Sequence, residues 1–303
     1  MFFFEAIPWY NVLTWFLVLG ILVGLNEIIR ASKWGSFAIF IVLPLALTPI
    51  WFFSPSELKS WFYWVKVYSA LAGSIIFMVI RFTDYHKTHK WYLALPPAIL
   101  GLNIFEAVVR EFQVGIANFQ GMVDGMNFIS GGWNYVNAIA GILNILMLCG
   151  WTGIYASKGK RKDMMWPDQT RFWVIAYGLW NISYVYSCAP GNSFYSGFAL
   201  NIAATIPAIL WAKGAWLQHR AATLSFWMMW VMTVPNFFAL GSTYNVAPSY
   251  NPAANWSIAL LSLALNIALT TYQVYRIVKF KRNPLKDEIY TDLPEYKYAN
   301  SFR

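Results

Sequence analysis

Nine apolar runs, each long enough to cross a lipid bilayer, occupy most of the chain. A hydrocarbon core of about 30 Å requires roughly 20 consecutive, mostly apolar residues in a helix. Such runs lie at 9–29, 34–53, 61–80, 91–109, 133–156, 171–188, 194–216, 222–240 and 256–278. Because lipid offers no hydrogen bonds to the backbone, each run must be helical. The sequence therefore predicts an all-α, polytopic membrane protein with a bundle of nine transmembrane helices.

The composition agrees with a chain that is surrounded by lipid. Of the 303 residues, 58% are hydrophobic and 12% are charged, whereas about 25% of an average soluble domain is charged. The 19 Gly, 14 Pro and 2 Cys exclude collagen-like, low-complexity and disulfide-rich classes. Cys149 and Cys188 fall at opposite depths of their predicted helices, so we expect two free thiols.

The basic residues predict the orientation. Lys and Arg near helix ends stay on the cytoplasmic side. With the N-terminus outside and the C-terminus inside, 19 of the 22 fall inside, and only Lys59, Lys66 and Arg110 fall outside. This asymmetry accounts for the net charge of +9, so we expect a lipid bilayer as partner and no nucleic acid. Residues 1–282 form the predicted bundle, and 283–303 a short cytoplasmic tail with no fold of its own.

Asparagine recurs inside the apolar runs. An amide exposed to hydrocarbon loses hydrogen bonds, so each should face another helix or water. Asn26 lies near the cytoplasmic end, and six others lie at mid-depth or in the outer half: Asn103, Asn144, Asn181, Asn201, Asn236 and Asn266. We hypothesise that these six line a polar cavity open to the outer side. The alternatives are hydrogen bonds that only hold helices together, and coincidence.

Charged residues and prolines add to this hypothesis. Lys66 and Glu106 lie near the outer ends of the third and fourth runs, and a pair between them could hold an ionic ligand or exchange a proton. In the alternative, Lys66 reaches the interface and Glu106 pairs only with Arg110. Glu27 and Lys213 could close the cytoplasmic side as a salt bridge. Five prolines inside spans predict kinked or interrupted helices, which are common where transporters bind substrates; they are Pro44, Pro96, Pro97, Pro207 and Pro235.

The outer connections are polar and aromatic and carry little charge. The segments 111–132, 187–196 and 241–255 are rich in Asn, Gly and Tyr. Amides and aromatic faces suit a neutral polar ligand, so these loops could form a lid. The alternative is an interfacial aromatic belt, which explains many of the 17 Trp and 18 Tyr without a ligand.

Catalytic and metal-binding patterns are absent from the sequence. We find no HExxH, G-x-S-x-G, Walker or dinucleotide-binding motif. His86 and His89 lie three residues apart, but lysines beside them would repel a cation. We therefore predict no catalytic residue, no metal and no cofactor.

Three stretches resemble an uncharacterised bacterial polytopic family that is defined as a domain of unknown function. They are Lys213-Gly214-Ala215-Trp216-Leu217-Gln218-His219-Arg220, Phe226-Trp227-Met228-Met229 and Asn283-Pro284-Leu285-Lys286-Asp287-Glu288 with Tyr290-Thr291-Asp292-Leu293. The similarity also includes Val65-Lys66-Val67-Tyr68-Ser69-Ala70-Leu71-Ala72-Gly73. The resemblance implies a bacterial cytoplasmic membrane but no activity, ligand or site residue.

These observations favour a transporter or permease for a small polar solute, bound by the six asparagines together with Lys66 and Glu106. A receptor or sensor for an extracellular ligand is the main alternative, and a membrane-embedded enzyme is the second.

Overall fold

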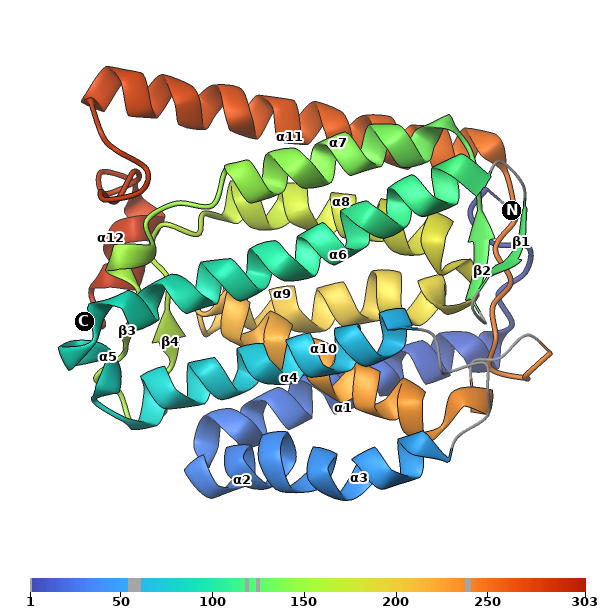
Figure 1. Ribbon diagram of the computed structural model, residues 1–303, viewed down its shortest axis with the longest axis horizontal. Helices are drawn as coiled ribbons and strands as arrows, with labels where there is room; N and C mark the ends of the chain where they lie inside the picture. The colour runs from blue at the N-terminus through green and yellow to red at the C-terminus, as the bar shows by residue number, and fades with distance from the viewer. Residues whose placement is uncertain (1, 54–60, 118–119, 124–125, 238–240) are drawn as a thin grey trace.

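Long helices, packed side by side and running in alternating directions, make up a bundle (Figure 1). The structure is a computed structural model that describes residues 2–53, 61–117, 120–123, 126–237 and 241–303. About 74% of the chain is helical, as the apolar runs predict. The N-terminus and the C-terminus lie at opposite ends of the bundle.

Helical segments fall in each of the nine predicted ranges of the described chain. They are α1 (Trp9–Ala31), α2 (Lys33–Phe37) with a π-turn (Ala38–Val42) and α3 (Leu43–Phe52), α4 (Trp61–Phe82), a 3₁₀ turn (Lys90–Ala94) with α6 (Leu95–Ala117), α7 (Gly132–Leu146), α8 (Arg171–Cys188), a π-helix (Ser193–Ala199) with α9 (Leu200–Leu210), α10 (Trp216–Thr233) and α11 (Pro252–Phe280). The short elements are α5 (Tyr85–Thr88), α12 (Pro294–Asn300), 3₁₀ turns at Trp151–Gly153, Pro190–Asn192 and Pro235–Phe237, and the antiparallel pairs β1 (Gln120–Val123) with β2 (Met126–Ile129) and β3 (Tyr155–Ala156) with β4 (Met164–Met165).

Six helical segments in the described part of the chain are long and apolar enough to cross a membrane. They are α1, Lys33–Phe52, α4, Lys90–Ala117, Pro190–Leu210 and α11. Their number makes the chain a multipass, all-α membrane protein. The other three do not meet this criterion: α7 has only 15 residues, and α8 and α10, with 18 residues each, are less apolar.

Two groups of helices share the interior. Helix α10 packs against α4, α9, α1 and α3, while α11 and α6 both pack against α7. Contacts of α4 with α6 and of α8 with α9 join the two groups. Every residue of α10 from Trp216 to Met229 is buried, so this helix is central and its polar side chains must find partners inside the protein.

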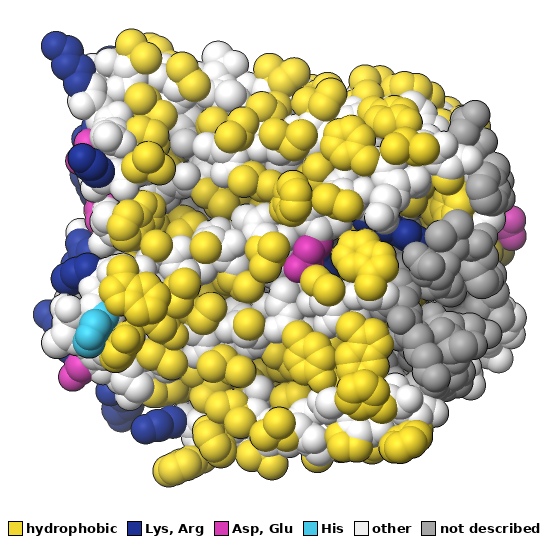
Figure 2. Space-filling model, in the orientation of Figure 1, with side chains coloured by type: hydrophobic (Ala, Val, Ile, Leu, Met, Phe, Trp, Pro, Cys, Tyr) yellow, Lys and Arg dark blue, Asp and Glu magenta, His cyan; other side chains and the backbone are white. Residues whose placement is uncertain are grey.

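The surface is apolar over its middle and basic at one end. Figure 2 shows hydrophobic side chains over most of this face, with Lys and Arg concentrated at the end where the C-terminus lies. That distribution is typical of a protein whose apolar middle lies in lipid and whose Lys and Arg side chains lie in water at one side of the membrane.

The prolines stand at several kinds of position. Pro207 lies inside α9, and Pro44 follows the π-turn at the start of α3. Pro96 and Pro97 fall in the first turn of α6, where a missing N–H costs nothing, and Pro235 begins the 3₁₀ turn after α10. Helix α9 continues through Pro207 to Leu210, Pro44 directly follows the π-turn that interrupts the α-helical geometry, and the remaining three lie at helix ends.

The basic end is closed by a layer that we call the end cap, formed by residues 147–170, 211–215 and 283–303 (left in Figure 1). The tail was expected to have no fold of its own, but α12 forms there, and Ile289 and Tyr290 are buried. Both carboxylate oxygens of Asp168 accept backbone N–H groups of these two residues, at 2.5 and 2.9 Å. The tail therefore packs on the bundle through Ile289 and Tyr290, two apolar residues that lie among charged residues in the sequence.

Candidate functional site

A buried ion pair joins α4 to α6. Lys66 Nζ lies 3.2 Å from Glu106 Oε2, and both residues are more than nine-tenths buried. Lys66 Nζ also donates to the Asn103 carbonyl oxygen at 2.8 Å. The predicted pair is thus present. Glu106 Oε1 finds no hydrogen-bond partner in the described chain.

Asn103 belongs to the same cluster. Its side-chain oxygen accepts a hydrogen bond from Ser69 Oγ at 3.3 Å, and its Nδ2 donates to the carbonyl of Ile99, one turn earlier. Ser69 Oγ also lies 3.4 Å from Glu106 Oε2. The helix α4 therefore presents a lysine and a serine, one turn apart, to the amide and the carboxylate of α6.

A second polar group gathers around Arg220 of α10. Asn201 Nδ2 of α9 donates to Asn181 Oδ1 of α8 at 2.9 Å, and Arg220 Nη2 donates to the same oxygen at 3.2 Å. Arg220 Nε donates to the Tyr177 hydroxyl at 3.0 Å. Arg220 is 95% buried, and its Nη1 has no hydrogen-bond partner among the residues described.

Two cavities meet at Arg220. The larger, about 70 Å³, is bounded by Lys66, Asn181, Tyr184 and Arg220 together with apolar side chains. The smaller, about 30 Å³, is bounded by Ser69, Asn103 and Arg220. Because about 10–15 Å³ of such space holds one water, the larger cavity has room for several waters or one small solute. The structure thereby brings Lys66, Asn103, Asn181 and the unpredicted Arg220 to one polar centre.

The other predicted asparagines lie elsewhere. Asn144 Nδ2 donates to the Ala140 carbonyl of its own helix, and Asn266 Nδ2 donates to the Ser262 carbonyl of its own helix and, at 3.4 Å, to the Ala176 carbonyl of α8. Both side chains are fully buried, and neither lines the two cavities. Asn236 is exposed in the turn after α10. Asn201 lines neither cavity, but its hydrogen bond to Asn181 Oδ1 positions the Asn181 side chain. The six asparagines therefore do not line one cavity: of the six, Asn181 lines the larger cavity and Asn103 lines the smaller one.

Sequence reasoning missed two ionisable residues because it placed them in loops. Arg220 was assigned to a cytoplasmic connection, although it lies in the second turn of α10. Glu111 was assigned to an outer loop, although it is fully buried in α6. Its carboxylate accepts from Asn134 Nδ2 at 2.6 Å and Asn137 Nδ2 at 2.7 Å of α7. A polar residue at the end of an apolar run has the same hydropathy whether it lies in a loop or in a buried site, so hydropathy does not distinguish the two.

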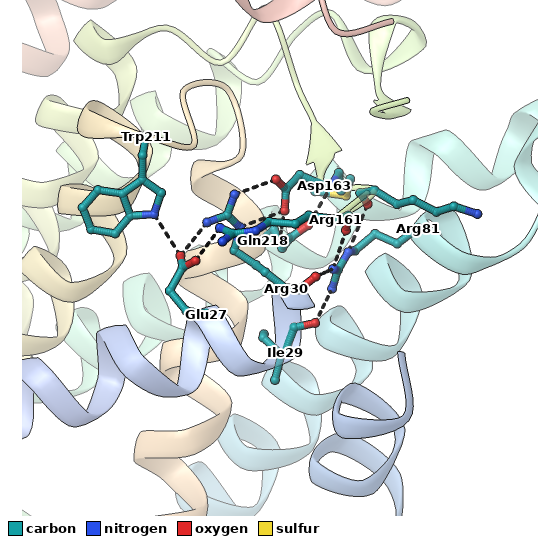
Figure 3. A network of polar contacts seen from close by, with 10 residues as sticks. Glu27, Ile29, Arg30, Arg81, Arg161, Asp163, Trp211 and Gln218 are labelled. Carbon is teal, nitrogen blue, oxygen red and sulfur yellow. Dashed lines mark hydrogen bonds and ion pairs between the residues drawn. The ribbon is translucent and has the colours of Figure 1, made fainter. Parts of the chain in front are cut away.

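An ionic network ties the end cap to the bundle (Figure 3). Arg30 of α1 donates to both carboxylate oxygens of Asp163, from Nε at 2.9 Å and Nη2 at 2.7 Å. Gln218 Nε2 of α10 donates to the same carboxylate at 3.0 Å. Burial alone would raise the pKa of Asp163, but hydrogen bonds and charge from Arg30 outweigh burial and hold that pKa below its ordinary value.

Glu27 and Arg81 complete this network. Glu27 pairs with Arg30 and with Arg161, each at 2.5 Å, and accepts from Trp211 Nε1 at 2.9 Å. The proposed pair of Glu27 with Lys213 is wrong, because Lys213 Nζ lies over the Tyr298 ring instead. Arg81 of α4 donates to four backbone carbonyls, which belong to Ile29, Arg30, Arg161 and Lys162. In this conformation α1, α4, α10 and the β3–β4 hairpin are therefore held together at the basic end.

Groups that could bind a metal are not found in the described chain: no cluster of three or more His, Cys, Asp or Glu side chains occurs there. Both cysteines are free and buried, and Cys149 lies beside Asp168 in the end cap. Burial and the neighbouring carboxylate raise the pKa of the Cys149 thiol well above its ordinary value, so this thiol is unreactive at neutral pH.

Comparison with known proteins gives a family and no activity. The model of a family of unknown function, DUF5692, matches residues 5–301. Neither the curated proteins nor the solved structures contain one that matches the chain. With nearly its whole length covered, the chain belongs to this family of unknown function.

Proposed function

We propose that the protein is a transporter or permease for a small polar solute, and that the cavity beside Arg220 is the solute's site. The observation that carries the proposal is a cavity of about 70 Å³ between the helices of the bundle, bounded in part by Lys66, Asn181 and Arg220. Ligand sites typically combine apolar walls with a few convergent polar groups. In helical bundles they lie between helices, as this cavity does.

We also propose how the chain sits in its membrane. All nine helical segments would span, with the N-terminus outside and the C-terminus inside, in the cytoplasmic membrane of a bacterium. The termini at opposite ends of the bundle support an odd number of spans (Figure 1). The concentration of Lys and Arg at the C-terminal end supports its cytoplasmic position (Figure 2).

The end cap suggests how access to the site would alternate. The pairs of Arg30 with Asp163 and of Glu27 with Arg161 join α1 to the cap at the basic end. Release of the solute on that side would require these pairs to separate. The described conformation would then be the one that is closed toward the cytoplasm.

Counterflow in proteoliposomes tests transport. Vesicles that contain the purified protein are preloaded with an unlabelled solute, and entry of the same labelled solute is followed for glycine, lactate, acetamide, glycerol and urea. We expect at least one to accumulate transiently above the level in protein-free vesicles. Leu224 borders both cavities, so Leu224→Trp should abolish this counterflow by filling them.

The matched control is Leu261→Trp, at an exposed position on α11. It should leave counterflow unchanged. Entry of none of the five solutes above background would contradict the proposal, and solute binding without counterflow would indicate a receptor instead.

A further inference from the structure

Arg220 carries a positive charge that the described protein does not neutralise. Its hydrogen-bond partners, the Tyr177 hydroxyl and the Asn181 side-chain oxygen, are both neutral. An arginine cannot lose its charge in a protein. A buried charge without a counter-ion is unfavourable, so Arg220 would favour the binding of an anion beside it.

The other ionisable groups at the cavity do not supply that anion. Lys66 borders the same cavity, but its charge is balanced by Glu106 at 3.2 Å. Neither Glu106 nor Glu111 lines the larger cavity. The described walls of that cavity therefore carry two cations and no carboxylate, and Arg220 Nη1 is without a partner.

The remaining walls limit the shape of the ligand. Apolar side chains make up much of the lining, among them Leu200, Leu224, Trp227, Met228 and Val231, and the neutral polar side chains of Tyr63, Tyr184, Asn192 and Ser196 complete it. These apolar walls favour a ligand that carries an apolar group, which phosphate and sulfate lack. A planar carboxylate, by contrast, matches the donors of a guanidinium.

We propose that the solute is a short-chain monocarboxylate, with its carboxylate on Arg220 and its alkyl chain against Leu224, Trp227 and Met228. This inference rests on the proposed function, because it takes the cavity as the solute's site. A monocarboxylate differs from the neutral ligand that the amides and aromatic residues of the outer loops predicted, because the cavity contains the cation Arg220.

Propionate and propionamide test the inference, because they have the same number of heavy atoms and differ in charge. Ligand-observed NMR with the purified, full-length protein in detergent gives the dissociation constants. We expect propionate to bind at least tenfold more tightly than propionamide. It should also raise the melting temperature, since a ligand that binds only the folded state stabilises it.

Variants assign the preference to Arg220. Arg220→Gln should abolish the difference between the two probes, and Arg220→Lys, which keeps the charge without the planar donors, should retain part of it. Lys279→Gln, at the exposed end of α11, serves as the control and should bind as the unmodified protein does. If Arg220→Gln does not fold, Leu224→Trp should remove propionate binding while Arg220 stays in place.

Equal binding of the two probes would overturn the inference, as would unchanged propionate binding by Arg220→Gln or displacement of propionate by equimolar inorganic phosphate. Failure here is distinguishable from failure of transport. Counterflow of neutral solutes alone would overturn the monocarboxylate and leave transport standing. Propionate binding without any counterflow would leave the site and overturn transport.

Discussion

Buried charges in this bundle are satisfied in three different ways. Lys66 and Glu106 neutralise each other, and Glu111 receives hydrogen bonds from the neutral amides of Asn134 and Asn137. Arg220 also has neutral partners, but it borders two cavities and keeps one nitrogen without an acceptor. Of the three arrangements, only that of Arg220 combines a bordering cavity with a cationic nitrogen that has no acceptor in the described chain.

The ion pair of Lys66 and Glu106 should show strong energetic coupling. Lys66→Met leaves a buried carboxylate without its cation, and Glu106→Gln leaves a buried ammonium, so each should lower the free energy of unfolding by about 3–5 kcal/mol. The double variant should cost less than either single change. Unfolding by a denaturing detergent measures all four proteins. Additive effects of the two single substitutions would contradict a coupled pair.

Residue-level prediction from the sequence succeeded where an apolar setting made the polar residue conspicuous. Asn103, Asn181 and Lys66 stood out because apolar residues surround them in the chain, and they do lie at the polar centre. Arg220 did not stand out, because it follows Gln218 and His219 and the three together look like a loop. All three are buried, and which neighbours bury them depends on tertiary packing that hydropathy does not contain.

The end cap explains why some predicted helix lengths are wrong. The run 133–156 is apolar throughout, but α7 ends at Leu146. Beyond it, Cys149 packs against Ile289 and Tyr290 of the tail, and Tyr155 packs against Ala299 of the tail and against Ala212 and Ala215 in the loop before α10. An apolar residue covered by a cap and one covered by lipid look alike in sequence, so hydropathy extended this span by about three turns.

Gly150 tests whether the cap depends on one backbone conformation. Its φ of 65° lies in the left-handed region, and a Cβ there would come within 2.1 Å of the Asp168 carboxylate that holds the tail. Gly150→Ala should therefore lower the free energy of unfolding by about 1–3 kcal/mol, measured by thermal or detergent unfolding.

Gly159→Ala is the matched control for this substitution. It lies in the β3–β4 hairpin, where a Cβ would meet nothing within 4 Å. We expect a change within about 0.5 kcal/mol. Equal effects of the two substitutions would show that the turn at Gly150 does not support the cap.

At the scale of the whole molecule, the sequence predicted a helical bundle and the positions of its helices well. The length of the apolar runs and the lack of hydrogen-bond partners in lipid were sufficient for that. The packing of α10 at the centre could not be predicted, because its polar and apolar residues are all buried and show no face pattern. The convergence of α4, α6, α8, α9 and α10 on one polar centre likewise depends on how the helices are arranged in space.

The proposed topology predicts opposite accessibility for two exposed loops. Lys160 lies in the β3–β4 hairpin of the cap, and Thr243 lies in the loop before α11. In intact cells, a membrane-impermeant thiol reagent should label Thr243→Cys and spare Lys160→Cys until the membrane is opened. The native cysteines are both buried and give the background. Labelling of both positions in intact cells would contradict nine spans.

Access of water to the cavity is the most direct test of the account. Ser196 borders the larger cavity and Ser262 lies buried on α11 away from it, so Ser196→Cys and Ser262→Cys form a matched pair. When an impermeant sulfonated methanethiosulfonate is added from outside, we predict that Ser196→Cys is modified and that Ser262→Cys is not. If Ser196→Cys is as unreactive as Ser262→Cys, the cavity is closed to water, and the proposed solute site is contradicted.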